Sequence, residues 1–336
     1  MPNFLKNKII SITGGNGFLG KHVIKRLEQR NCKKVLAADH KAYNLVDGRD
    51  VQKMYQDHKP DIVFHLAAAV GGIGVNERNP GRFFYDNAMM NLQVMHGGYL
   101  NKIEKIISIG TVSVYPKNSP IPFNEKNIWE GYPETTNAPY GIAKRIMHSH
   151  SISYRKQYEY NSILLILTNL FGPGDNFNPE TSHVVAALIK RFYDAKKNNE
   201  KEVVVWGSGE STRDFCYVED VAEGIVLAAE KYNKSDPVNL ASGYEVKIKD
   251  LALIIKKKIK YNGNIVWDTS KPVGPDRRKI DISKAENEFG YKVRTKLEDG
   301  IQKTIEWYLS NNWNSNFDYK AVFVILYISL IIAVVK

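Results

Sequence analysis

A tyrosine and a lysine four residues apart, Tyr140 and Lys144, are the residues whose types and spacing most clearly allow catalysis. Side chains at this spacing lie on one face of a helix, so the ammonium can sit beside the phenol. A phenol has an ordinary pKa of about 10, and a neighbouring cation favours its ionised form. The pair therefore indicates proton transfer to or from a substrate oxygen. Thr111, in the segment GTVSVYP, is predicted to hydrogen-bond the same oxygen.

Three glycines at every third position, Gly14, Gly17 and Gly20, stand between an apolar run and a helical pattern. Glycine allows a tight turn, lets backbone N–H groups approach a pyrophosphate and lets the helix pack closely on the sheet. This context indicates a site for a nicotinamide dinucleotide, NAD(P)(H), whose cationic ring would join Lys144 in lowering the pKa of Tyr140. Besides the glycines and Lys144, the predicted contacts are Asn16, Phe18, Leu19, Asp39 and Ala67. We expect no metal ion.

Asp39 bears on which dinucleotide is bound, because it ends the second apolar run, 25 residues after Gly14. A carboxylate there can hydrogen-bond both ribose hydroxyls of an adenosine and would repel a 2'-phosphate. The sequence therefore favours NAD(H) over NADP(H). His40 and Lys41 follow directly and could instead turn toward a phosphate.

Apolar runs alternate with helical patterns in the first half of the chain, which predicts a parallel sheet covered on both faces. The runs are 9–13, 34–39, 61–67, 105–110 and 162–167, and the helices are 21–30, 141–158, 182–197, 220–232, 249–260 and 297–309. We expect an α/β fold, a Rossmann-type doubly wound parallel sheet with a smaller C-terminal α/β substrate lobe. Residues 1–172 would hold the dinucleotide and the Tyr/Lys pair, and residues 173–318 the substrate lobe, from which the chain may cross back.

The charge and the cysteine content limit the kinds of ligand and the cellular compartment that we expect. The 336 residues hold 47 Lys and Arg against 36 Asp and Glu, a net charge of +11 that suits anionic ligands. The charge is dispersed, and its dense run, 256–260, follows an apolar helical pattern, so we expect a solvated helix face and no nucleic-acid partner. Two cysteines and the lack of a cleavable leader favour a reducing compartment, the cytoplasm.

The end of the chain, residues 319–336, is an apolar tail. Its uninterrupted apolar stretch, 321–335, is shorter than the roughly 18 to 20 residues that a membrane-spanning helix needs. We expect a non-native or poorly ordered extension, with a hydrophobic contact segment and a membrane tail as open alternatives.

With these motifs in place, the sequence resembles the GDP-L-fucose synthases, which are 3,5-epimerase/4-reductases of GDP-4-keto-6-deoxy-D-mannose within the extended short-chain dehydrogenase/reductases. The resemblance covers residues 8 to about 312. It rests on AAAVGGIGVN (67–76), GYPETTNAPYGIAK (131–144), NLFGPGDNFNPETSHVVAALIKRF (169–192), VVVWGSGESTRDFCYVEDVA (203–222) and WDTSKPVGPDRR (267–278). It implies a GDP-sugar substrate, NADP(H) as the family's usual cofactor, and a homodimer formed through residues 87–100 and 140–158.

The resemblance also assigns acid/base roles. Protons at C3 and C5 flank the C4 ketone, so epimerisation needs a base and an acid. His183 falls where the family has its histidine acid/base, and Ser113 falls where the family has a cysteine. Because a hydroxyl is a much weaker acid than a thiol, the double epimerisation is the step that this chain puts in doubt.

For the nucleotide end of the substrate, the resemblance points to four residues. Arg191 and Arg213 suit a diphosphate, and Trp206 can pack on a flat ligand surface. The fourth is Asn169. The family's aspartate after Lys-Pro is Val273 here, which weakens the expectation for guanine or ribose recognition.

Two other functions stay open from the sequence. An NAD-dependent C4 epimerase of a nucleotide sugar fits Asp39 and Ser113, because C4 chemistry needs no further acid/base. A non-catalytic dinucleotide-binding scaffold is the alternative of another class, and the retention of Tyr140 and Lys144 speaks against it. A 4,6-dehydratase is disfavoured, because that chemistry usually places an Asp-Glu pair directly after the threonine, where Val112 and Ser113 stand.

Overall fold

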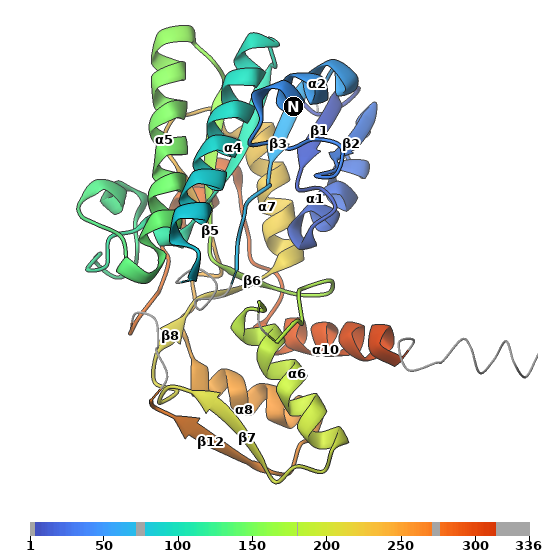
Figure 1. Cartoon of the computed structure of the whole chain (residues 1–336), viewed down its shortest axis with the longest axis vertical. Coiled ribbons are helices and arrows are strands. Elements are labelled where there is room, and N and C mark those ends of the chain that lie inside the picture. The colour runs from blue at the N-terminus through green and yellow to red at the C-terminus, as the bar shows by residue number, and fades with distance from the viewer. Residues whose placement is uncertain (1–3, 72–77, 180, 271–275, 314–336) are drawn as a thin grey trace, which may run out of the picture.

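A six-stranded parallel sheet forms the centre of the computed structural model, which describes residues 4–71, 78–179, 181–270 and 276–313 (Figure 1). The strand order is β10-β5-β4-β3-β1-β2. The strands are β1 (Ile9–Thr13), β2 (Lys34–Ala38), β3 (Ile62–His65), β4 (Lys105–Thr111), β5 (Ser162–Leu167) and β10 (Val238–Leu240). The predicted α/β fold is confirmed. All five predicted strands form, and β10 adds a sixth at the edge.

The strand order reverses at β1, which lies between β2 and β3. In open parallel sheets, ligands bind in the crevice beyond the carboxyl ends of the strands at such a reversal. The glycine-rich turn follows β1 at this edge, and Ala67 follows β3. The fold therefore brings the predicted dinucleotide contacts to one crevice.

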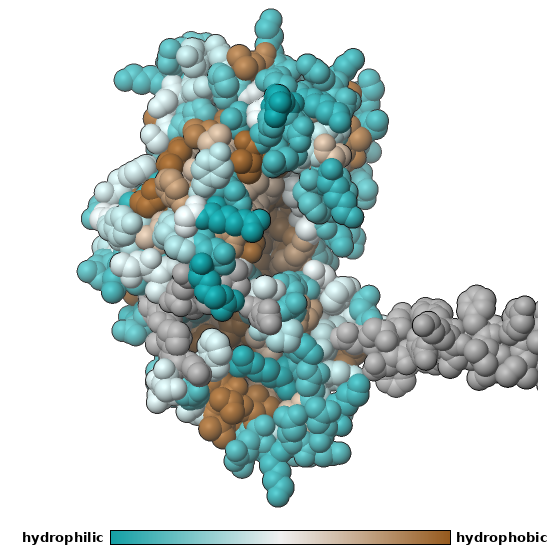
Figure 2. All heavy atoms as spheres, viewed as in Figure 1, coloured by the Kyte–Doolittle hydropathy of each residue, from teal (hydrophilic) through white to brown (hydrophobic). Residues whose placement is uncertain are grey.

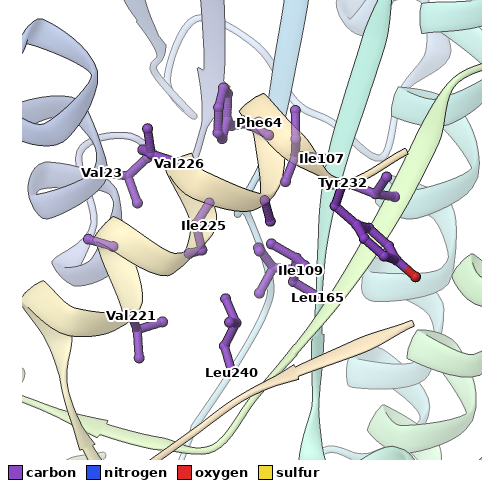
Figure 3. Close-up of a cluster of buried hydrophobic side chains, with 14 of the residues drawn as sticks. Val23, Phe64, Ile107, Ile109, Leu165, Val221, Ile225, Val226, Tyr232 and Leu240 are labelled. Atoms are coloured by element: carbon purple, nitrogen blue, oxygen red, sulfur yellow. The ribbon is translucent and has the colours of Figure 1, made fainter. Parts of the chain in front are cut away.

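Helices cover both faces of the sheet. α1 (Phe18–Glu28) and α7 (Val218–Lys231) pack on one face, and α2 (Gly48–His58), α4 (Pro80–Leu100) and α5 (Ala138–Tyr158) lie on the other. Successive strand residues point to opposite faces. Ile107 and Leu165 accordingly meet Ile225 of α7 in one core (Figure 3), whereas Ile106 and Leu164 join the core beneath α2 and α4.

A smaller lobe lies below the sheet in Figure 1. It contains α6 (Val184–Lys197), α8 (Ile248–Ile259), α10 (Leu297–Trp313) and the parallel pair β7 (Glu202–Trp206) and β12 (Asn264–Asp268). Its core is separate from the cores that contain the sheet residues and includes Val185, Phe192, Val203, Ile255 and Ile301.

Short strand pairs join the two parts. β6 (Asn169–Phe171) pairs with β9 (Phe215–Tyr217), and β8 (Thr212–Arg213) pairs with β11 (Val246–Lys247). The chain then returns to the sheet with α7 and β10, and later with α9 (Ser283–Phe289), which packs on α7. The division at residues 172 and 173 stays a prediction. In Figure 2 the surface is hollowed between the two parts, with apolar residues in the recess.

The apolar tail, 319–336, lies outside the described residues. Across 4–71, 78–179, 181–270 and 276–313, no helix is long and apolar enough to cross a membrane.

Candidate active site

The turn after β1 is closed by contacts that only glycine permits. Gly14 has a φ of +71°, and a Cβ there would lie 2.9 Å from the backbone nitrogen of Ala67. A Cβ at Gly20 would lie 2.2 Å from the carbonyl oxygen of Gly14. The Gly17 N–H donates to that same carbonyl at 3.0 Å. The start of α1 is thereby packed directly on the turn.

The N-terminus of α1 is open to an anion. Its N-cap residue is Gly17, with no side-chain cap, and its first turn holds no acidic residue. Asn16 and Gly17 are exposed, while Phe18 and Leu19 are half-buried. Unpaired N–H groups and the helix dipole favour a phosphate at this position. The residues present therefore fit a dinucleotide, which would lie across Gly14 to Gly20 and against Ala67.

Asp39 follows β2 and remains accessible, with its side chain 49% exposed. Its Oδ1 accepts the backbone N–H of Lys41 at 2.8 Å, and the His40 ring lies 3.6 Å from the same oxygen. The carboxylate thus stands at the carboxyl edge of the sheet, as predicted. One of its oxygens is engaged in its own turn.

A buried hydrogen-bond chain that sequence reasoning missed links this crevice to α5. Asn91 Nδ2 donates to the carbonyl of Ala143 at 3.2 Å, so its Oδ1 faces His65 Nε2 at 3.0 Å. His65 Nδ1 pairs with Thr13 Oγ1 at 2.7 Å, and that hydroxyl accepts the Ala67 N–H at 3.3 Å. Burial, followed by the charge of Lys144, lowers the pKa of His65 to about 3. His65 is therefore neutral, and the chain joins β1, β3, α4 and α5.

Tyr140 and Lys144 share one face of α5, as predicted, and the Lys144 Nζ lies 6.0 Å from the centre of the Tyr140 ring. Lys144 is 2% exposed, and burial lowers its pKa to about 8. Burial raises the pKa of the Tyr140 phenol instead of lowering it. The physical reason is desolvation, which disfavours the phenolate and which the Lys144 ammonium does not offset here.

Thr111 is the last residue of β4, and Ser113 lies in the turn that follows it. Both are half-buried, and the Ser113 N–H approaches Thr111 Oγ1 at 3.4 Å as the chain enters the short helix η1 (Val112–Val114). This turn lies against α5, because a Cβ at Gly141 would lie 2.2 Å from the Ser113 carbonyl oxygen. The fold therefore brings Thr111 and Ser113 to the helix that carries Tyr140.

His183 is the N-cap residue of α6. The helix predicted over 182–197 begins at Val184 in the structure. Its ring is exposed to solvent but closely surrounded by protein, and this desolvation lowers its pKa. Asn169, in β6, is half-buried, and its Nδ2 donates to the carbonyl of Asp214 at 3.1 Å.

Arg191 and Trp206 form a contact in the smaller lobe. The Arg191 guanidinium lies 5.7 Å from the centre of the Trp206 ring and donates to the Val204 carbonyl at 3.2 Å. Trp206 is 50% exposed, so its indole is available to a ligand and is not part of a core.

Arg213 lies near a second arginine, Arg278, that sequence reasoning did not single out. Burial, and then the charge of Arg278, lower the pKa of Arg213 to about 10. Burial also lowers the pKa of Arg278, whose buried Nε has no partner among the described residues. Two guanidinium groups this close suit a shared anion. Val273 lies outside the described residues.

Comparison with known proteins agrees with this geometry. The model of the NAD dependent epimerase/dehydratase family matches residues 10–241. GDP-L-fucose synthase 1 of Arabidopsis thaliana is 35% identical over 309 residues, which are 92% of this chain and 95% of the relative.

Two solved structures share the fold. A GDP-L-fucose synthetase of Naegleria fowleri, bound to NADP, has a TM-score of 0.82 and 28% identity over 91% of this chain and 95% of its own. A GDP-6-OMe-4-keto-L-xylo-heptose reductase of C. jejuni has a TM-score of 0.86 and 27% identity over 93% and 99%. The resemblance to the GDP-L-fucose synthases is thereby confirmed, and the chain belongs to the NAD dependent epimerase/dehydratase family.

Proposed function

We propose that this protein is a GDP-sugar epimerase/reductase that converts GDP-4-keto-6-deoxy-D-mannose, or a close relative of it, to GDP-L-fucose or the corresponding sugar. One observation carries the proposal. Tyr140 and Lys144 share a face of α5, and α5 packs on the turn that follows Thr111, in a chain that matches a GDP-L-fucose synthase over 92% of its length.

Reduction at C4 follows from the groups present. Tyr140 holds its proton, because burial raises its pKa, and it donates that proton to the C4 oxygen. Thr111 hydrogen-bonds the same oxygen, and Lys144 keeps a positive charge close to it. When bound, the reduced nicotinamide supplies the hydride.

Recognition of the nucleotide uses the smaller lobe. Arg213 and Arg278 bind the diphosphate, because their mutual repulsion is relieved by an anion between them. Trp206, with Arg191 against its ring, offers an exposed flat face to the ligand. Asn169, which bonds the carbonyl of Asp214 next to Arg213 in the chain, completes this set.

Proton exchange at C3 and C5 rests on His183 and Ser113. The neutral imidazole of His183 accepts a proton, whereas the Ser113 hydroxyl neither accepts nor releases one readily near neutral pH. We therefore expect proton exchange, which must precede reduction because it needs the C4 ketone, to be the slow step of the conversion.

Deuterium wash-in from heavy water at C3 and C5 of a GDP-4-keto-6-deoxy sugar tests the epimerase half. Ser113→Cys should exchange faster than wild type, and His183→Asn should lose exchange. If none of the three proteins exchanges either proton while C4 is still reduced, the chemistry is confined to C4. Absence of any turnover with the sugar and either dinucleotide would contradict the proposal as a whole.

Chemistry confined to C4 is the second candidate, and it has a specific observation in its favour. Ser113 occupies the place of the family's cysteine, and the similar C. jejuni structure is that of a 4-keto-sugar reductase. Net dinucleotide use distinguishes a C4 reductase from a C4 epimerase, because the reductase consumes one dinucleotide per sugar and the epimerase consumes none.

For the dinucleotide, we propose a preference for NAD(H), based on the accessible carboxylate of Asp39 at the end of β2. Asp39→Arg should shift kcat/KM toward NADP(H), because the change removes a repulsive charge and adds a phosphate partner. Asp299→Arg, at an exposed carboxylate in the first turn of α10 in the smaller lobe, adds the same charge as a control. A wild type that already strongly prefers NADPH would overturn the argument.

Association into a homodimer is proposed through α4 and α5. Their outer faces expose Tyr85, Leu100, Ile152 and Tyr158, and the Tyr99 and Tyr158 rings stack 4.4 Å apart. A two-fold axis makes one such apolar face complementary to itself. Light scattering after size exclusion should give twice the chain mass, and Ile152→Glu should reduce it to the chain mass.

A further inference from the structure

Two contacts fix the η1 turn against α5. Gly141 lies so close to η1 that a Cβ would meet the Ser113 carbonyl oxygen at 2.2 Å. One helical turn later, Arg145 Nε donates to the Val114 carbonyl at 2.8 Å. Residues 141 and 145 lie on one face of the helix. α5 therefore holds two consecutive carbonyls of η1, the turn that carries Ser113 and follows Thr111.

The guanidinium of Arg145 also packs against the ring of Trp129. Its central carbon lies 5.5 Å from the centre of the Trp129 ring, and Trp129 stacks on His148 at 5.9 Å. Trp129 ends the short helix η2 (Glu125–Trp129), and its indole N–H donates to His148 Nδ1 at 3.2 Å. An indole N–H can only donate, so His148 accepts and is neutral. Trp129 is thus held in place although it is 55% exposed.

Arg145 has no evident role in an ion pair. It is 5% exposed, and its buried Nη2 has no hydrogen-bond partner among the described residues. Burying a guanidinium without a counter-ion is costly, and a methionine could fill the same space with less loss. The arginine adds the bond to Val114 and the contact with the Trp129 ring, and the bond to Val114 bears on the geometry of the turn.

We propose that Arg145 is a positioning residue for catalysis, which sets Thr111 and Ser113 against Tyr140 by holding the Val114 carbonyl to the helix that carries the phenol. The inference rests on the proposed function, because it assumes that these three side chains act on one sugar. A misplacement of about 1 Å in such a set reduces turnover on the order of 100-fold.

Arg145→Met is the test variant, and Arg155→Met is its matched control. Arg155 lies on the same helix and also donates through Nε to a backbone carbonyl, that of Ser162, at 2.8 Å. It makes two further bonds, to Asn161 and Asn233, so its loss should destabilise the fold at least as much. Arg145→Lys retains a donor and should recover part of the lost activity.

The measurements are kcat and KM for the GDP-4-keto sugar, dinucleotide affinity, and the midpoint of thermal unfolding. We expect Arg145→Met to lower kcat on the order of 100-fold, with KM and dinucleotide Kd within about threefold of wild type. Arg155→Met should keep wild-type kcat while unfolding at a lower temperature. Equal kcat in the two variants, or a loss confined to KM, overturns the proposal.

A crystal structure of Arg145→Met gives a readout that needs no substrate. Displacement of η1 from α5 supports the proposal, and an unmoved turn overturns it. If wild type turns over no GDP-4-keto sugar, the proposed function fails, and this structural comparison still decides whether Arg145 sets the turn.

Discussion

Acid should destabilise this protein through two buried histidines, His65 and His148. Burial lowers the pKa of His65 to about 3 and that of His148 to about 4, against an ordinary value of about 6.5 in an unfolded chain. Between these values the unfolded chain binds protons that the folded chain does not. The part of the folding stability that depends on these two neutral histidines is therefore fully present above about pH 6.5. It is lost progressively as the pH falls toward 4.

The magnitude follows from the pKa difference. At pH 5 the unfolded value exceeds the solution pH by about 1.5 units, so each histidine removes about 2 kcal/mol from the free energy of unfolding, and the pair removes about 4 kcal/mol. Both side chains are nearly inaccessible, 1% and 5% exposed, so solvent screening reduces this little.

Urea unfolding at pH 7.5, 6 and 5, followed by tryptophan fluorescence, measures the effect. Other groups titrate in the same range. The informative quantity is therefore the difference between wild type and variant in how steeply the free energy of unfolding falls with pH. His148→Gln should remove about 2 kcal/mol of the decrease between pH 7.5 and 5, whatever its stability at pH 7.5. His40→Gln replaces a ring that is 89% exposed and serves as the control for a histidine-to-glutamine change. Equal slopes in wild type and His148→Gln would refute the reasoning.

Three further predictions concern the active site. Tyr140→Phe should reduce turnover by about 100-fold or more while dinucleotide affinity changes little, and near-normal turnover would contradict the assignment of the phenol as proton donor. Wild-type kcat should fall as the pH rises through about 8, because Lys144 loses its charge there; a profile flat to pH 9.5 would argue against a charged role. Gly20→Ala should abolish dinucleotide binding measured by calorimetry, since its Cβ would lie 2.2 Å from the Gly14 carbonyl oxygen, whereas Gly81→Ala, where a Cβ meets nothing within 4 Å, tests the effect of a glycine change alone.

Local patterns were sufficient to predict the sheet. Four of the five predicted strands are apolar runs buried between helices, and β2, at the sheet edge, is partly exposed. Such runs are visible in sequence because both faces of a parallel strand need apolar side chains. β10 has three residues and β7 alternates exposed with buried positions, so neither stood out. The glycine-rich turn could be predicted because close approach restricts its residues to glycine.

The electrostatics of the site could not be predicted in the same way. The sequence shows that Lys144 is near Tyr140, which by itself lowers the phenol's pKa, but burial depends on the whole fold and raises it. The chain of Thr13, His65 and Asn91 joins residues distant in sequence. Of the adjacent arginines, Arg277 forms a bidentate pair with Glu245. Only the structure shows that Arg278, and not Arg277, lies near Arg213.

The directions in which the pKa values of the site residues are shifted favour reduction at C4 over oxidation. A phenol that keeps its proton is ready to donate to a ketone oxygen, as reduction of C4 requires, whereas an oxidative C4 epimerase must first remove a proton from a hydroxyl. His183, whose pKa is lowered, is likewise ready to accept a proton from C3 or C5. Ser113 is the group that cannot readily return one. In the proposed mechanism, the side chains therefore provide one donor at C4 and one base for epimerisation. C4 reduction should be fast, and the supply of a second acid should limit epimerisation.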